Sequence, residues 1–213
     1  ADQRIDQRLL ALLVDQHIIG READLPGVHH LAHRHLRCDL AQIGAPAVGA
    51  LMTQLYRGPE QTRVLAANVL ARIGAFAVEA LFAALRQRNE EVRRAARLAL
   101  HQMKDHSAIP FLAAGVEDAH PLVRQEAILA LGRLGGEEAL PYLLRGLRDA
   151  DKDVRLAALS AFTERTALRA IPALVPLLRD PDGVVRQRTA ALLQDVGPSV
   201  VEPLLVEFQD YNW

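Results

Sequence analysis

The sequence predicts an all-α protein, a right-handed αα-solenoid (superhelix) of about six helix pairs. Two observations predict this fold: a Val-Arg pair recurs at a nearly constant interval, and small and large side chains follow each Arg at fixed distances. Self-similarity with a period of roughly 20–50 residues is typical of solenoids, in which each unit packs on its neighbours. The pairs recur every 31 residues as Val92-Arg93, Val123-Arg124, Val154-Arg155 and Val185-Arg186, and Thr62-Arg63 precedes the first by 30.

The residues that follow each Arg indicate how neighbouring helices pack. A small residue comes three positions later and a large apolar one seven positions later, so both lie on one side of a helix. Small residues let helices approach closely, and large ones interdigitate between them. We therefore expect these two columns to form the core: Ala66, Ala96, Ala127, Ala158 and Thr189, and Leu70, Leu100, Leu131, Phe162 and Leu193.

Each unit is predicted to contain two helices. The helix that carries the Arg ends at a glycine, which adopts the left-handed conformation that terminates many helices. A shorter second helix follows, with a proline near its start, where the missing N–H costs no hydrogen bond. The glycine ends are Ile43-Gly44, Ile73-Gly74, Leu134-Gly135 and Val196-Gly197, and the prolines are Pro110, Pro141 and Pro172.

Three units also carry an Asp six residues before the Arg, as in "ALGRLGGEEALPYLLRGLRD", which ends at Asp149. This pattern resembles HEAT repeats, in particular the short bilin-lyase-like (PBS-lyase) subclass, over roughly residues 30–209. The resemblance implies a ladder of Asp–Arg hydrogen bonds between successive repeats and a concave face lined by the helices that carry the Arg. A turn carboxylate can also accept from backbone N–H groups at a helix start. The expected ladder residues are Asp118, Arg124, Asp149, Arg155, Asp180 and Arg186.

The chain is predicted to divide into three parts. Residues 1–27 form an N-terminal capping helix and turn, 28–209 the solenoid, and 210–213 an aromatic tail. Arg57 and Gln87 stand where the ladder Asp is expected, which predicts a broken ladder in the earlier units. Short solenoids with exposed ends are suited to docking within a larger assembly.

Composition narrows the function classes. Half of the residues are hydrophobic, 4% are aromatic, and the net charge is −1, so the basic excess typical of nucleic-acid partners is missing. Cys38 is the only cysteine, which excludes an intrachain disulfide. No uninterrupted apolar run approaches the ~20 residues that span a bilayer. We expect a cytoplasmic protein without a membrane partner.

Four of the eight histidines fall within residues 29–35. His29 and His33 are four residues apart, so they share a helix face and are the candidate ligands for a transition metal. No further ligand follows at a recognisable spacing, although Cys38 and Asp39 lie nearby. The sequence therefore predicts solvated or paired histidines, with no metal and no other cofactor.

The concave face is the predicted binding surface. The residues one, five and eight positions after each ladder Arg share one helix face. They are a mixture of polar side chains, with exposed leucines along the middle. Such a mixture suits a protein or peptide partner better than a phosphate backbone. The predicted contact residues are Arg94, Leu98, His101, Gln125, Leu129, Leu156, Ser160, Gln187 and Gln194.

Three functions are compatible with these features. The first is a non-catalytic scaffold or adaptor that binds a partner along the concave face. It is favoured because no phosphate loop, nucleophile elbow or zinc-binding Cys pair occurs. The second, implied by the resemblance, is a bilin-lyase-like subunit acting on a tetrapyrrole-carrying antenna protein, although no catalytic residue matches. The third is a nucleic-acid-binding HEAT-like protein, which the leucine column and the net charge disfavour.

Overall fold

The computed structural model describes residues 47–201 and residue 205. The regular elements of these residues are all helical, which confirms the predicted all-α solenoid. The predicted N-terminal cap, most of the first repeat and the aromatic tail lie outside the described residues.

Helices that carry the ladder Arg alternate with partner helices, most of them shorter, that are preceded or followed by a 3-10 turn. A helix at residues 47–57 comes first. The five arginine helices are α3 (Glu60–Ile73), α5 (Glu90–Gln102), α7 (Pro121–Leu134), α9 (Lys152–Ala161) and α11 (Gly183–Val196). The partner helices are α4 (Val78–Leu85), α6 (Ile109–Gly115), α8 (Leu140–Gly146) and α10 (Glu164–Leu174). The 3-10 turns are η1 (Gly74–Ala77), η2 (His106–Ala108), η3 (Gly136–Ala139), η4 (Val175–Arg179) and η5 (Gly197–Val200).

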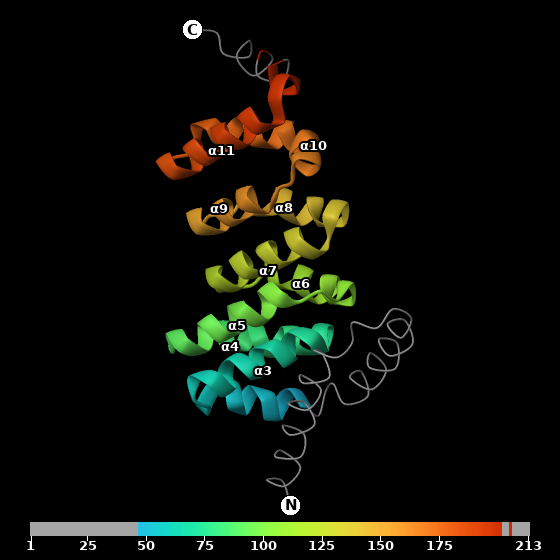
Figure 1. Cartoon of the computed structure of the whole chain (residues 1–213). Coiled ribbons are helices and arrows are strands. Elements are labelled where there is room, and N and C mark those ends of the chain that lie inside the picture. Colours follow the sequence, from blue (N-terminus) through green and yellow to red (C-terminus); the bar gives the residue numbers. More distant parts are fainter. Residues whose placement is uncertain (1–46, 202–204, 206–213) are drawn as a thin grey trace, which may run out of the picture.

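The helix pairs stack in the order of the chain (Figure 1). Helices α5, α7, α9 and α11 follow one another along one side of the stack, and α6, α8 and α10 lie along the other. The most extensive contacts join consecutive arginine helices, α3 with α5 and α7 with α9, while α4 packs on α6 and α8 on α10. Each repeat is thus held mainly by the repeats before and after it.

The two predicted core columns are buried, as expected. Every small residue of the first column and every large residue of the second is at most 9% exposed. The large side chains of one helix fill the space that the small residues leave at its neighbour, which gives one continuous core along the stack.

Turn side chains start most of the arginine helices. Asn89, His120, Asp151 and Asp182 each accept a hydrogen bond from a backbone N–H in the first turn of the helix that follows. These bonds satisfy donors that have no partner inside the helix, and the carboxylates also favour the positive end of the helix dipole.

Two details of the predicted helix ends are wrong. Gly74 and Gly197 adopt positive φ (71° and 79°), but Gly135 has φ of −87°, and the next residue, Gly136, takes the left-handed conformation instead. Pro172 lies inside α10 and not at its start, because Thr163 and Thr166 form a capping box that begins this helix eight residues earlier, at Glu164. Pro110 and Pro141 do occupy the first turns of α6 and α8.

Residues Glu60–Leu85 are long and apolar enough to cross a membrane, with a mean hydropathy of 1.7 in their most apolar 18-residue window. The structure contains α3, η1 and α4 in this segment, and Gly74 separates the two α-helices. Both helices place residues such as Leu70 and Leu81 in the core of the stack. The apolar composition of the segment is therefore explained by its position as a packed helix pair.

Candidate functional site

The ladder arginines hold the turn of their own repeat. Arg124 donates from Nη1 to the carbonyl oxygens of Asp118 and Ala119, at 2.9 and 3.2 Å. Arg93, Arg155 and Arg186 repeat this pattern with the carbonyls six and five residues before them. A planar guanidinium can serve two carbonyls and still direct its other N–H groups elsewhere.

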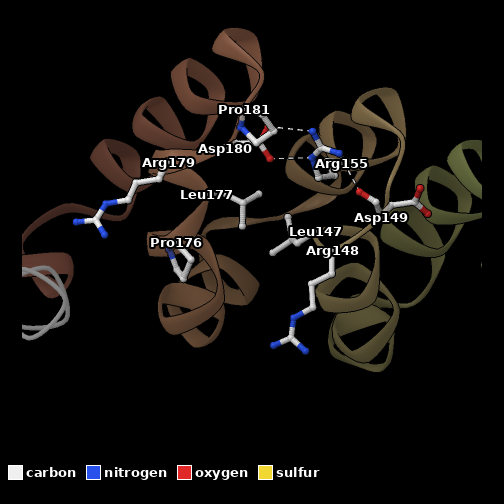
Figure 2. A pocket seen from close by; sticks show the side chains of 9 residues that line it. All are labelled: Leu147, Arg148, Asp149, Arg155, Pro176, Leu177, Arg179, Asp180 and Pro181. Carbon is white, nitrogen blue, oxygen red and sulfur yellow. Dashed lines mark hydrogen bonds and ion pairs between the residues drawn. The ribbon is translucent and has the colours of Figure 1, made fainter. Parts of the chain in front are cut away.

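Two of these arginines also bind the next repeat. Arg124 donates to both carboxylate oxygens of Asp149, at 2.7 and 2.8 Å. Arg155 lies 2.8 and 2.9 Å from the carboxylate oxygens of Asp180 (Figure 2). Each aspartate further accepts the backbone N–H of the residue two positions later. The structure thus brings these four predicted ladder residues together in pairs that join consecutive repeats.

The environment of Asp149 favours its charged form. Partial burial acts to raise the pKa of this carboxyl, but the hydrogen bonds from Arg124 and from the Asp151 N–H outweigh it, so the pKa lies below its usual range. The same hydrogen bond raises the pKa of Arg124. The pair is therefore ionised at neutral pH.

The ladder is irregular towards the N-terminal end of the stack, as Gln87 predicts. Arg63 meets no ladder carboxylate in the next repeat, and its Nη1 lies 3.8 Å from Glu91 instead. The carboxylate of Asp118 pairs with Arg86, while Arg93 pairs with Glu90 of its own helix. Arg93 therefore keeps the carbonyl contacts of a ladder arginine but not the link to the next repeat.

A depression of about 380 Å³ lies beside the ladder, between two successive turns. The buried Leu147 and Leu177 form part of its wall with Pro176, and Arg148 and Arg179 extend away from the ladder at its edge (Figure 2). The depression is open to solvent and contains no catalytic pair of side chains.

The predicted contact residues lie on the arginine helices, but their exposure differs from the expectation. Arg94, His101, Ser160, Gln187 and Gln194 are exposed. Leu98, Leu129 and Leu156 are partly buried and pack against the core. Gln125 is also only partly exposed. We call these nine residues, together with Val64, the arginine-helix face. Whether this face is concave stays a prediction.

Val64 was missed by the sequence-based selection. It is 40% exposed and lies one position after Arg63. The same position in the later repeats holds Arg94, Gln125 and Leu156, so the column rule applied to α3 identifies it.

A charged cluster at the seam between α5 and α7 was also missed. The carboxylate of Glu126 is 3% exposed, lies 3.1 Å from His101 Nε2 and is 4.0 Å from Arg97 Nε. Arg133 lies two helical turns after Glu126 on the same face of α7, and its positive charge acts to lower the pKa of Glu126. We call Arg97, His101, Glu126 and Arg133 the Glu126 cluster.

Burial dominates the electrostatics of this cluster. It raises the pKa of Glu126 above its usual range, against the opposing effects of His101, Arg97 and Arg133. Burial likewise lowers the pKa of Arg133, and Glu126 partly offsets this. The fold therefore bears a cost for keeping Glu126 ionised, which its three basic neighbours reduce.

We expect this cost to appear in the pH dependence of stability. Because the pKa of Glu126 is higher in the folded than in the unfolded protein, the native state binds more protons between the two pKa values. Relative to Glu126→Gln, the wild type should lose stability as pH rises from below 4.5 through the raised pKa. Urea unfolding of both proteins across this range measures the difference. A difference that stays constant, or that grows in favour of the wild type, would contradict the assignment.

The candidate metal ligands His29 and His33 lie outside the described residues, as does Cys38. Within residues 47–201, no group of three or more His, Cys, Asp or Glu side chains is arranged to hold a metal ion.

A family model for HEAT repeats matches the chain over residues 48–119, 78–163 and 112–194. These overlapping matches cover more than half of the sequence, and the chain belongs to the HEAT-repeat proteins. The resemblance noted in the repeat pattern is thereby confirmed, and the 31-residue period with its Asp–Arg pairs fits the short subclass.

Several solved structures are similar to the chain. One is a designed armadillo repeat protein in complex with the peptide (KR)4, with 19% identity, a TM-score of 0.43, and coverage of 81% of this chain and 96% of that one. Another is the complex of CpcE and CpcF of phycocyanin lyase from Nostoc sp. PCC7120, with 22% identity, a TM-score of 0.42, and coverage of 76% and 97%. A third is an engineered protein with 23% identity, a TM-score of 0.43, and coverage of 76% and 86%. No curated protein matches the chain.

Proposed function

We propose that the protein is a non-catalytic scaffold that binds a protein or peptide partner along the arginine-helix face. The observation that carries the proposal is a row of accessible apolar side chains on one face of successive arginine helices. Val64 and Leu156 follow the ladder Arg by one residue, and Leu98 and Leu129 follow it by five, which is one helical turn further on the same face. Polar side chains such as Gln125 and Ser160 accompany this row. Apolar contacts bordered by polar ones are the usual composition of a protein interface.

The rigidity of the stack supports this function. The ladder bonds at Arg124 and Arg155 fix the spacing of α7, α9 and α11, so the side chains of these helices are held in place before a partner arrives. Pre-organisation of this kind reduces the entropy lost on binding.

Replacement of the apolar row tests the proposal. We expect the variant Leu98→Ser/Leu129→Ser/Leu156→Ser to lose a partner that the wild type retains in affinity purification with mass spectrometry. The matched control replaces Phe76, Phe111 and Leu168, which are 48–57% exposed on η1, α6 and α10, with serine. Circular dichroism of both variants checks that the helices persist.

A partner that is lost only in the control would place the binding surface on the other side of the stack and overturn the proposal. The bilin-lyase-like alternative is distinguished by absorbance. It predicts a spectral change when the protein is mixed with a linear tetrapyrrole, and the scaffold proposal predicts none.

A further inference from the structure

The Glu126 cluster has no counterpart at the next seam of the stack. The position of Glu126 holds Ala95 and Ala157 in the neighbouring repeats, and both are buried. Where α5 has Arg97, α7 has the fully buried Ile128. At these positions α7 and α9 meet through apolar and small side chains, so the repeat can pack there without a charged cluster.

Burial of a carboxylate costs free energy that packing alone does not return. The neighbouring repeats show that alanine fills the same position, so the presence of Glu126 is not explained by the architecture. A buried carboxylate with specific charged partners is a candidate for a functional site.

The basic side chains around Glu126 are not fully neutralised. Arg97 is shared between two carboxylates: Glu126 lies 4.0 Å from its Nε, and Glu90 lies 2.7 Å from its Nη2. The Nε atom of Arg97 is buried and has no hydrogen-bond partner among the described residues. Within the same part of the chain, the structure records no ion pair within 4.0 Å for Arg133. His101 is 45% exposed although one ring nitrogen contacts Glu126. The exposed side chains of His101 and Arg133 therefore lie around a single buried carboxylate.

The cluster lies within the arginine-helix face. His101 is three residues after Leu98 on α5, and Leu129 lies between Glu126 and Arg133 on α7. Residues three and four apart share a helix face, so the donors and the two leucines are neighbours. A partner segment that contacts both must combine an apolar side chain with an acidic one.

We propose that the Glu126 cluster anchors an Asp or Glu side chain of an extended partner segment, with Arg133 and His101 donating to its carboxylate. This inference rests on the proposed function and specifies the chemistry of the partner. Glu126 is then a positioning residue: it is too buried to reach a partner, and its contact with His101 Nε2 at 3.1 Å holds the imidazole at the surface.

The geometry of the repeats suggests a simple probe. Packed helices lie about 8–10 Å apart, and an extended chain advances about 3.3 Å per residue, so about three residues span one repeat. The probe is a fluorescein-labelled (Leu-Glu-Ser)4 peptide with blocked ends. Two matched peptides carry Gln or Lys in place of Glu.

We expect the Glu peptide to bind the wild type about tenfold more tightly than the Gln peptide, in fluorescence anisotropy at low salt. The Lys peptide should bind more weakly than either. Arg133→Gln and His101→Gln should reduce the preference for the Glu peptide to about twofold or less. The control Arg145→Gln should keep it, because Arg145 lies on α8 and pairs with Glu117 at 2.9 Å.

The outcomes separate this inference from the proposed function. Equal binding of the Glu and Gln peptides, weakened in both cases by the triple leucine variant, would overturn the carboxylate anchor alone. A Glu preference that survives Arg133→Gln but disappears in Arg145→Gln would overturn it as well. Failure of every peptide to bind, or binding that the leucine replacements leave unchanged, would overturn the proposed function too.

Discussion

Replacing Arg155 with alanine is expected to lower the free energy of unfolding by about 3–5 kcal/mol. The side chains of Arg155 and Asp180 are only 11% and 7% exposed, so the variant leaves a buried carboxylate without its cation. It also removes the donor that serves the carbonyls of Asp149 and Ala150. Chemical denaturation followed by circular dichroism measures the loss.

The same position one repeat later provides the control. Arg186 donates to the carbonyls of Asp180 and Pro181, at 2.7 and 3.1 Å, and is exposed. Arg186→Ala is expected to cost about 1 kcal/mol, the usual value of such hydrogen bonds. Arg155→Lys should recover little, since an ammonium group cannot supply the same set of planar donors. Equal losses of unfolding free energy in Arg155→Ala and Arg186→Ala would show that the Arg155–Asp180 ion pair adds no stability beyond the hydrogen bonds to the turn carbonyls.

A pair of glycine substitutions is expected to change stability in opposite directions. A Cβ at Gly132 would lie 2.5 Å from Ala161 Cβ and 3.1 Å from its carbonyl oxygen, so Gly132→Ala must push α7 away from α9. We expect a loss of about 1–3 kcal/mol. A Cβ at Gly49 meets nothing within 4 Å, and Gly49→Ala should stabilise its helix by up to about 1 kcal/mol.

Thermal unfolding of the two single variants and of the wild type tests this pair. Both positions are helical, so the intrinsic preference of alanine for helices acts equally at each and the difference isolates the contact. A Gly132→Ala variant that is as stable as Gly49→Ala would contradict the close approach of α7 and α9.

The fold could be predicted because its information is local and repeated. The columns at Ala127 and Leu131 recur often enough to establish helix pairs and a core, and both are buried as expected. The helix ends were less predictable. Either of two adjacent glycines could end α7, and only the path into η3 selects Gly136. The early start of α10 depends on the Thr163–Thr166 capping box, which stands where α3, α7 and α11 are followed by a glycine.

The candidate site was harder to predict because it depends on pairs that are distant in the sequence. His101 and Glu126 are 25 residues apart, the same separation as Arg124 and Asp149. That shared interval is a usable signal, since positions related by it face each other across a seam. The exposure of Leu98 could not be obtained in this way, because it depends on how far the side chain folds back onto the core.

The uneven ladder has a mechanical consequence. Two-pronged ionic clamps join α7 to the turn before α9 and α9 to the turn before α11, whereas α3 and α5 share a single ion pair at 3.8 Å. Under tension applied to its ends, the stack behaves as a spring whose stiffness differs along its length. The junction between α3 and α5 resists tension through its packed side chains, while those from α7 to α11 also have bidentate ion pairs to keep their pitch.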